Sequence, residues 1–383
     1  MTTTITNSKN IIGFSVLGLG TLLGLVSVGY VLMIGHSNAY NLTRQIPWGI
    51  LISTYVFFAV SCSGLCLVSS LGHVFGIKEF EAIGKRAILV AILALLTGFG
   101  VIAMELDHPF RMAIWVILSP NPLSAIWWMG TLYGLYLILL CIELYAFIKE
   151  NHRLASLVGL VGFVVAISAC SNLGAVFGLL EARPFWHGPY LPIFFILSAL
   201  VSGCALLALI VYFNHSLRGI EMPPEYKKFM ITLGKLQALL LGILLFFIIW
   251  KIIPGLYEKY PGIYEATMAA LSGKLSFNFW FFEAFLGLIL PFILLLNNST
   301  RTPFGVMLAG LLTTVGVFFM RYDMVIAGQI VPMRISDGGK ATGVLHYVPS
   351  VAEMGIVIGS ICACLFVYVL IEKKFDLSHT GHH

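Results

Sequence analysis

Ten apolar stretches, each about as long as a bilayer is thick, constrain the fold of this 383-residue chain more than any other feature. A helix needs about 20 apolar residues to cross the hydrocarbon core. Charged residues make up only 10% of the chain and hydrophobic residues 59%, a composition that cannot form a soluble surface. We therefore predict an all-α integral membrane protein with about ten transmembrane helices. These lie at 11–34, 48–76, 86–105, 122–148, 154–181, 190–213, 229–253, 277–296, 304–326 and 348–371.

The lysine and arginine residues indicate how these helices are oriented. Cytoplasmic loops of membrane proteins carry an excess of Lys and Arg. If both termini are cytoplasmic, most of the Lys and Arg residues of this sequence lie on the cytoplasmic side. The two long connections, 252–276 and 327–347, lie on the other, outer side, and long ordered loops are often functional. We predict a multi-pass protein of the cell inner membrane with an outer docking surface. All seven tryptophans fall at outer helix ends: Trp48, Trp115, Trp127, Trp128, Trp186, Trp250 and Trp280.

The second and sixth apolar stretches resemble each other. FFAVSCSGLCLVSS at 57–70 and ILSALVSGCALLAL at 196–209 share a Ser-Gly pair, Ser63-Gly64 in one and Ser202-Gly203 in the other. The copies are offset by four helices, an even number, so both point the same way across the membrane. The small residues of Ser61–Gly64 let another helix approach closely. An alternative is that any two helices rich in Leu and Ser look alike.

This repeat predicts two four-helix bundles with a peripheral helix at each end of the chain. The predicted units are 1–46, with the first peripheral helix and an outer loop; 47–185, the first bundle; 186–330, the second bundle; and 331–383, with an outer loop, the last helix and a cytoplasmic tail.

Ionisable side chains are concentrated at the end of the third apolar stretch, in the segment MELDHPFRM at 104–112. Ionisable groups at the edge of a bilayer cost free energy unless they are paired, solvated or used, so this cluster is the first candidate for a functional site. Pro109 disfavours helix at the residue before it and predicts a turn there. The cluster consists of Glu105, Asp107, His108 and Arg111.

No recognisable ligand set for a metal ion, haem or iron–sulfur cluster stands out in the sequence. The seven cysteines form no CxxC pair, and no histidines face each other inside apolar stretches. The tail histidines His379, His382 and His383 could bind a stray metal ion, although a disordered terminus is the simpler interpretation. We predict a chain without a metal site or redox cofactor of its own.

The polar side chains inside the apolar stretches include two amides and three carboxyl groups. For the amides Asn172 and Gln237, hydrogen bonding between helices is the simpler explanation. Carboxyl groups at such positions often lie on proton or substrate routes. Glu143, Glu283 and Glu353 are therefore candidates for a proton path.

At four places in order, the chain resembles the NrfD-like or PsrC-like membrane subunits of the polysulfide reductase type. The matching segments are 47–81, 104–128, RYDMVIAGQIVP at 321–332 and YVPSVAEMGIVIG at 347–359, the last two resembling a ten-span branch. The resemblance implies a quinone- or quinol-reactive membrane subunit of an oxidoreductase complex in anaerobic respiration. Such a subunit has no redox cofactor of its own. It exchanges electrons between menaquinone or ubiquinone and a ferredoxin-like iron–sulfur subunit at the outer face, with further redox subunits beyond it.

In this family the quinone headgroup lies near the outer face of the first bundle, between a histidine and an acidic residue. The acidic position matches Glu105, whereas the histidine position falls at Tyr55, which donates a hydrogen bond but does not exchange protons at neutral pH. His108 could supply the missing titratable group. We predict that Arg111 holds one carboxylate ionised. The predicted proton-exchanging residues are Glu105, Asp107 and His108, and the predicted quinone-binding residues are Tyr55, Trp48, Arg111, Trp127 and Trp128.

Two other functions remain open. A secondary transporter or ion-translocating protein would also have repeated bundles and intramembrane carboxylates, although its repeats would more often be inverted, with helices broken at the midplane. A purely structural anchor would lack the acid cluster. No nucleic acid partner is predicted for this protein.

Overall fold

The computed structural model describes residues 8–257, 259–332 and 344–374, and its described elements are all helices. Ten of them are long and apolar enough to cross a membrane, which confirms the predicted fold class. Their bounds agree with the predicted stretches to within a few residues, and α10 is longer at both ends. They are α1 (Ser8–Ile34), α3 (Ile50–His73), α5 (Gly84–Glu105), α7 (Ala125–Ile148), α8 (His152–Gly178), α9 (Tyr190–Arg218), α10 (Pro224–Tyr257), η1 (Asn278–Ile289) continued by α12 (Leu290–Leu296), α13 (Pro303–Ala327) and α14 (Val351–Lys374).

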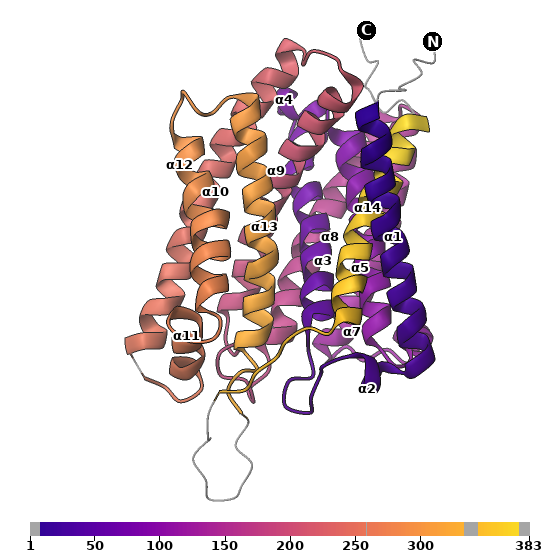
Figure 1. Ribbon diagram of the computed structural model, residues 1–383. Coiled ribbons are helices and arrows are strands. Elements are labelled where there is room, and N and C mark those ends of the chain that lie inside the picture. The colour runs from indigo at the N-terminus through magenta and orange to yellow at the C-terminus, as the bar shows by residue number, and fades with distance from the viewer. Residues whose placement is uncertain (1–7, 258, 333–343, 375–383) are drawn as a thin grey trace, which may run out of the picture.

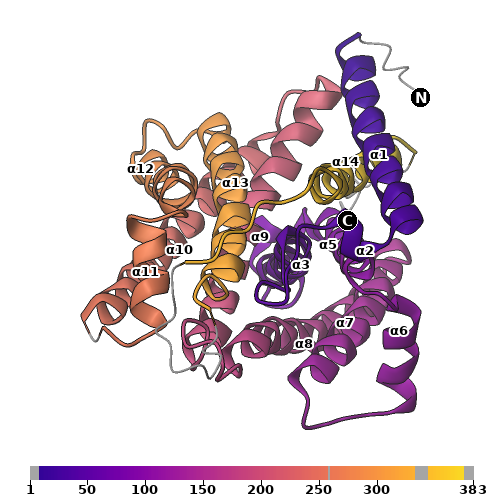
Figure 2. The same ribbon diagram turned by 60° about the horizontal axis from the view of Figure 1, so that its bottom comes forward.

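The two ends of the bundle differ. Helix α1 begins and α14 ends at the same end, which we call the terminal face (Figure 1). All seven tryptophans belong to helix ends or connections at the opposite end, which we call the tryptophan face. Three short helices, α2 (His36–Ala39), α6 (Pro109–Leu118) and α11 (Ile263–Leu271), lie at the tryptophan face, and α4 (Lys78–Glu81) lies at the terminal face (Figures 1 and 2).

Helix α3 lies at the centre of the molecule, and α1 and α14 lie side by side at its edge (Figure 2). In the most apolar window of α3, 94% of the residues are buried, against 17% in α1 and 22% in α14. Helices α3 and α7 both pack on α5 and α8, whereas α9 packs on α10 and α13, and η1 packs on α13. The division of the chain into two four-helix bundles stays a prediction. The tail histidines and the middle of the loop at 327–347 lie outside the described residues.

Two glycines bring α3 and α9 into backbone contact. A Cβ atom added at Gly64 would lie 2.7 Å from the carbonyl carbon of Ala199 and 2.9 Å from the amide nitrogen of Gly203. A Cβ atom added at Gly203 would in turn overlap the backbone of Gly64. The small-residue segment of α3 therefore does receive another helix, and the helix it receives carries the matching Ser-Gly pair.

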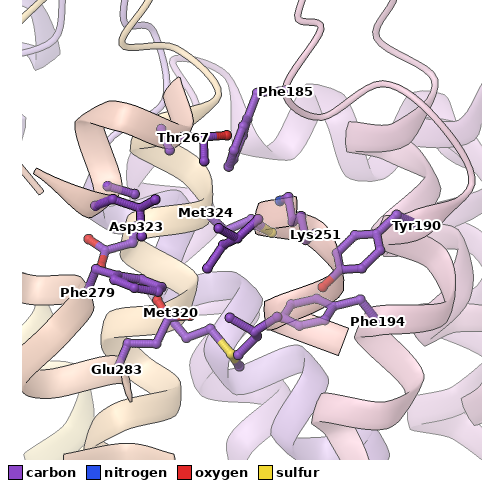
Figure 3. Close-up of a pocket in the computed structure, with 15 residues that line it drawn as sticks. Phe185, Tyr190, Phe194, Lys251, Thr267, Phe279, Glu283, Met320, Asp323 and Met324 are labelled. Carbon is purple, nitrogen blue, oxygen red and sulfur yellow. The ribbon is translucent and has the colours of Figure 1, made fainter. Parts of the chain in front are cut away.

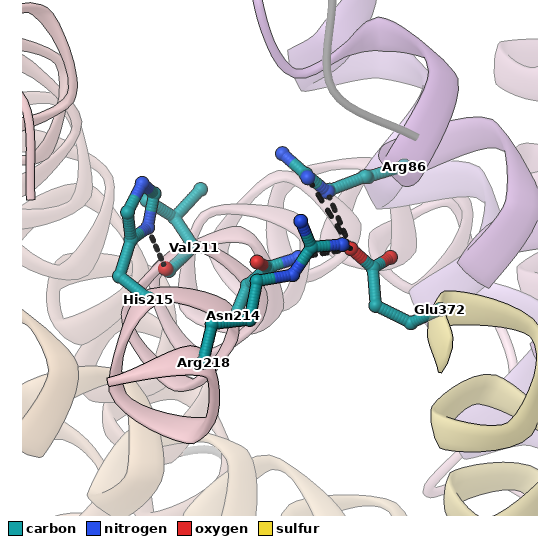
Figure 4. A network of polar contacts seen from close by, with 6 residues as sticks. All are labelled: Arg86, Val211, Asn214, His215, Arg218 and Glu372. Carbon is teal, nitrogen blue, oxygen red and sulfur yellow. Dashed lines mark hydrogen bonds and ion pairs between the residues drawn. The ribbon is translucent and has the colours of Figure 1, made fainter. Parts of the chain in front are cut away.

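A carboxylate at the terminal face joins three helices (Figure 4). Glu372 of α14 accepts hydrogen bonds from Arg86 of α5 (Nη2, 3.2 Å) and from Arg218 of α9 (Nη2, 2.6 Å). Asn214, one turn before Arg218, donates to the same oxygen at 2.5 Å. These bonds attach the peripheral α14 to the helices inside the molecule.

Candidate functional site

Glu105 ends α5 at the tryptophan face, and its side chain is half-buried. The Oε2 atom is buried and has no hydrogen-bond partner among the described residues. The hydroxyl of Tyr40 donates to the carbonyl of Met104 at 2.7 Å, beside this carboxyl group. Burial and the nearby Glu105 and Glu353 carboxylates raise the pKa of the Tyr40 hydroxyl well above its ordinary value. Tyr40 therefore stays protonated, and Glu105 has an oxygen that is free to accept a hydrogen bond.

Asp107 lies at the surface, with 83% of its side chain exposed. Its carboxylate forms an ion pair with His36 Nδ1 at 2.8 Å, and the His36 ring stacks on Tyr40 with 5.4 Å between centroids. Sequence reasoning missed both His36 and Tyr40, because they precede the acid cluster by more than sixty residues and lie in a short connection. Their only sequence signal is their place just after the first apolar stretch.

His108 and Arg111 lie at the surface. His108 is the residue before α6, which begins at Pro109, so the backbone turns where the proline predicted it. Both side chains are exposed, and the ion pairs found in the described part of the protein include none with Arg111. The expected bond from Arg111 to a carboxylate is thus replaced by the pair between His36 and Asp107. Helix α6 itself stands off from the core at the edge of the tryptophan face (Figure 2).

Trp127 binds the backbone of α6, and Trp128 binds the segment that joins α6 to α7. Trp127 Nε1 donates to the carbonyl of Val116 at 2.8 Å, and Trp128 Nε1 donates to the carbonyl of Pro122 at 2.8 Å. Their side chains are thereby tied to the local backbone, and 39% of Trp128 remains exposed. The structure does not bring these two rings together with Glu105 through any contact in the described residues.

Glu353 is fully buried at the start of α14, on the same face as Glu105. Its carboxylate accepts hydrogen bonds from the backbone amides of Asn41 (3.2 Å) and Ser350 (2.7 Å) and from the hydroxyl of Tyr347. Burial and this carboxylate raise the pKa of Tyr347, so the hydroxyl remains a donor. The same hydroxyl accepts from the amide of Ile50 at 3.0 Å. Glu353 therefore connects α14 to the start of α3.

The backbone of Trp48, just before α3, is held by a residue that lies 281 positions later in the sequence. Gln329 donates from Nε2 to the carbonyl of Trp48 (2.8 Å) and accepts at Oε1 from its amide (3.0 Å). The Trp48 ring stacks on Trp186 with 5.3 Å between centroids. Gln329 was missed as a site residue, although it lies in the segment RYDMVIAGQIVP that carried part of the family resemblance. The predicted quinone-binding Trp48 is thus held rigidly.

Tyr55 lies deeper in the bundle than the other predicted site residues. It is 3% exposed, and its ring packs near Gly98 of α5, where an added Cβ atom would lie 3.6 Å from the ring. Tyr133 of α7 lies close enough to Tyr55 to interact electrostatically. Tyr55 is therefore a buried phenol below the level of Glu105.

The other polar residues inside the spans have different surroundings. Glu143 is fully buried and forms an ion pair with His73, with 2.6 Å between Oε1 and Nε2. Asn172 donates to the carbonyl of Ala125 at 2.9 Å, and Gln237 donates to Thr313 at 3.2 Å. Both amides join neighbouring helices, as the simpler explanation predicted.

A cavity lies near the tryptophan face among α9, α10, α11, η1 and α13 (Figure 3). Its space, mouth included, is about 590 Å³. Lys251 Nζ lies 3.9 Å from the centre of the Phe185 ring, and Asp323 Oδ2 is buried without a partner among the described residues. Glu283 reaches the cavity from η1, a π-helix that precedes Pro291, and such wide turns are frequent at functional sites. The cavity places two carboxyl groups and an amine against aromatic walls.

The sequence matches a protein family described as Polysulphide reductase, NrfD over residues 38–333. It is 27% identical to the Hdr-like menaquinol oxidoreductase integral membrane subunit of Archaeoglobus fulgidus, over 91% of this protein and 89% of that one. It is 26% identical to a selenate reductase subunit of Mesobacillus selenatarsenatis, over 83% and 82%. It is 25% identical to a polysulfide reductase subunit of Wolinella succinogenes, over 78% and 98%. The similarity therefore covers most of each protein.

Proposed function

This chain belongs to the NrfD family of polysulphide reductase membrane proteins, and on that premise we propose that it is the quinone-reactive membrane subunit of a respiratory oxidoreductase complex. The names of two relatives, a menaquinol oxidoreductase subunit and a selenate reductase subunit, support this assignment. The subunit exchanges electrons between menaquinone or ubiquinone and a ferredoxin-like iron–sulfur subunit at the tryptophan face. The complex lies in the cell inner membrane, with the terminal face toward the cytoplasm.

The observation that carries the proposal is the unpartnered carboxyl oxygen of Glu105. A buried polar atom without a hydrogen bond costs about 1–3 kcal/mol, so its persistence suggests a ligand that supplies the missing donor. A quinol ring has two hydroxyl donors and fits this requirement. Glu105 Oε2 is buried at a helix end, near a face of the membrane that a quinone headgroup can reach. The residues present therefore fit a quinol at this place.

Each residue of the site has a separate task in this proposal. Glu105 accepts a hydrogen bond from one ring hydroxyl and then accepts its proton. Tyr40 stays protonated and orients the C-terminal end of α5 through its bond to the carbonyl of Met104. Tyr55 provides a hydroxyl donor deeper in the site. The pair of His36 and Asp107 at the surface provides an imidazole, the type of side chain best suited to exchanging protons with water near neutral pH. Trp48 borders the site with an aromatic ring just before α3, whereas the described hydrogen bonds of Trp127 and Trp128 go to the backbone in and after α6.

Replacement of Glu105 by Gln tests the proposal. The amide keeps the shape of the side chain but cannot titrate, and acid or base help is worth about a hundredfold to ten-thousandfold in rate. Turnover of a water-soluble quinol analogue by the assembled complex should fall at least tenfold, while the variant still copurifies with its partner subunits. Glu150, in the exposed turn after α7 at the terminal face, is the matched control. Equal turnover by Glu105→Gln and Glu150→Gln across the pH range would show that the quinone site does not lie at Glu105.

A further inference from the structure

Helices α10 and α12 lie side by side at the edge of the molecule opposite α1 (Figures 1 and 2). A groove runs between them, with a space of about 960 Å³ when its open side is included. One face of α10 forms the first wall, because residues at intervals of three and four share a helix face. The apolar part of the groove is lined by Leu239, Ile243 and Phe246 of α10 and by Phe292 and Leu296 of α12.

The groove is open toward the membrane. In the membrane-spanning part of α10, 61% of Leu239 and 59% of Phe246 are exposed, and such apolar surface is in contact with lipid chains. A glycine keeps the floor of the groove low, since a Cβ atom added at Gly242 would lie 3.2 Å from Cε2 of Phe292. The groove therefore has the apolar walls and the open side that a lipid chain requires.

Two basic side chains lie at the end of the groove that faces the terminal face. Lys235 of α10 is exposed, and Arg301 follows α12 in the short connection to α13. The stem of Arg301 lies on α10, because a Cβ atom added at Gly234 would be 3.3 Å from its Cγ. Its guanidinium donates from Nη1 to the carbonyl of Leu295 at 3.0 Å and from Nη2 to the side chain of Asn298. Its Nε is buried and has no hydrogen-bond partner in the described part of the chain.

The protein does not neutralise these two positive charges. The recorded hydrogen-bond partners of Arg301 are neutral oxygens, and the ion pairs of the described residues do not include Lys235. By contrast Lys227, about two turns earlier on the same helix, pairs with Glu221 at 2.9 Å. The described residues that line the groove include no carboxyl group. The groove is therefore cationic at one end and apolar along the rest of its length.

The groove has the depth of one leaflet of a bilayer. Eleven residues separate Lys235 from Phe246 on α10, which corresponds to a rise of about 17 Å. The hydrocarbon core is about 30 Å thick, so one leaflet contributes about 15 Å of it. The two basic side chains therefore lie at the level of the lipid headgroups when the apolar walls lie at the level of the acyl chains.

We propose that this groove binds one acidic phospholipid from the leaflet at the terminal face. Lys235 and Arg301 contact its phosphate, and one acyl chain lies between α10 and α12 along Leu239, Ile243 and Phe292. Basic pockets between transmembrane helices are typical sites for acidic headgroups. A zwitterionic headgroup brings its own cation toward the two protein cations and so binds less tightly. The inference goes beyond the proposed function and does not depend on any redox reaction.

Native mass spectrometry of the full-length protein in mild detergent tests the proposal. The protein is titrated with phosphatidylglycerol, which is acidic, or with phosphatidylcholine of the same acyl chains, which is zwitterionic. One phosphatidylglycerol should bind at least fivefold more tightly than phosphatidylcholine, since each basic residue near the membrane surface contributes about a fivefold change in affinity. Equal affinity for the two lipids would overturn the proposal.

Replacement of Lys235 by Gln tests the headgroup contact. The affinity for phosphatidylglycerol should fall about fivefold, and the affinity for phosphatidylcholine should stay the same. Lys149→Gln is the matched control, because Lys149 is also exposed at the terminal face but lies in the turn after α7. This control should bind phosphatidylglycerol as the wild type does. Equal affinities of the Lys235→Gln and Lys149→Gln proteins would show that the headgroup does not lie at Lys235.

Replacement of Ile243 by Trp tests the acyl-chain contact, because it fills the groove and keeps both cations. Phosphatidylglycerol binding should weaken at least fivefold. Ile249→Trp is the control, since Ile249 is 55% exposed on the same helix and does not line the groove. Wild-type binding by Ile243→Trp would contradict the placement of the chain.

Two other occupants of the groove give distinct results in these experiments. Glycerol phosphate has the headgroup chemistry without the chains and should not displace phosphatidylglycerol; displacement would reduce the site to a simple anion site and overturn the proposal. A protein dimer that persists without lipid and separates in the Ile243→Trp variant would assign the groove to a second copy of the chain and would also overturn it.

Discussion

Replacement of Gly64 by Ala should destabilise the protein at the contact between α3 and α9. The added Cβ atom would lie 2.7 Å from the carbonyl carbon of Ala199, whereas carbon atoms in contact are about 3.5–4.0 Å apart. The helices would therefore have to separate by about 1 Å, a gap that forfeits roughly a quarter to a half of the dispersion energy between the facing atoms. Overpacking of this kind costs about 1–3 kcal/mol.

The effect can be measured as the apparent midpoint of thermal unfolding in detergent, at a fixed scan rate because such unfolding is often irreversible. Gly134→Ala on α7 and Gly100→Ala on α5 are matched controls, since an added Cβ atom at either position meets nothing within 4 Å. These controls should unfold at or above the wild-type midpoint, because Ala is a better helix former than Gly. A Gly64→Ala midpoint equal to that of Gly134→Ala would refute close backbone packing as the reason for the glycine.

Two further predictions concern the tryptophan face and the orientation. Tyr347→Phe removes the hydroxyl that donates to Glu353 and accepts from the amide of Ile50, so stability should fall by about 1–3 kcal/mol. The pKa of Tyr347 is raised in the folded state, so this stabilisation is fully present below about pH 10, the ordinary pKa of tyrosine, and decreases as the pH rises further. The unfolding midpoints of wild type and variant should therefore differ at about pH 8 and approach each other above about pH 10. For the orientation, a cysteine in place of the exposed Ser272 should react with an impermeant thiol reagent in intact cells, and one in place of the exposed Arg153 should react only after the membrane is opened. The opposite labelling pattern would invert the predicted topology.

The sequence alone predicted the features that depend on local pattern. Apolar length located all ten long helices, and Pro109 located the turn after α5, because both signals act within a few residues. The small residues around Gly64 also predicted close helix packing, although the partner helix could be named only as a repeat. A local apolar pattern is sufficient to locate a transmembrane helix, because the thickness of the bilayer sets the length that the helix must have.

The site could be predicted only in part, because its contacts join segments that are distant in the sequence. His36 and Asp107 are 71 residues apart, and Trp48 and Gln329 are 281 apart. No periodicity links such residues. The predicted role of Arg111 assumed that neighbours in sequence are neighbours in space, and the turn at His108 instead carries Arg111 onto the exposed α6.

The pairing of α1 with α14 has a consequence for how the protein is made. Gly24 meets Gly359 in backbone contact, and Gly355 lies against Ser27, so α1 is completed by α14, a helix that is synthesised much later. At about 5–20 residues per second, on the order of twenty to seventy seconds pass before α14 leaves the ribosome. Throughout that time α1 must persist in lipid without its partner, which suits a helix that is apolar on nearly every side. Insertion of α14 therefore completes this pair of helices, and a ribosome that stops before it leaves α1 without the helix on which it packs.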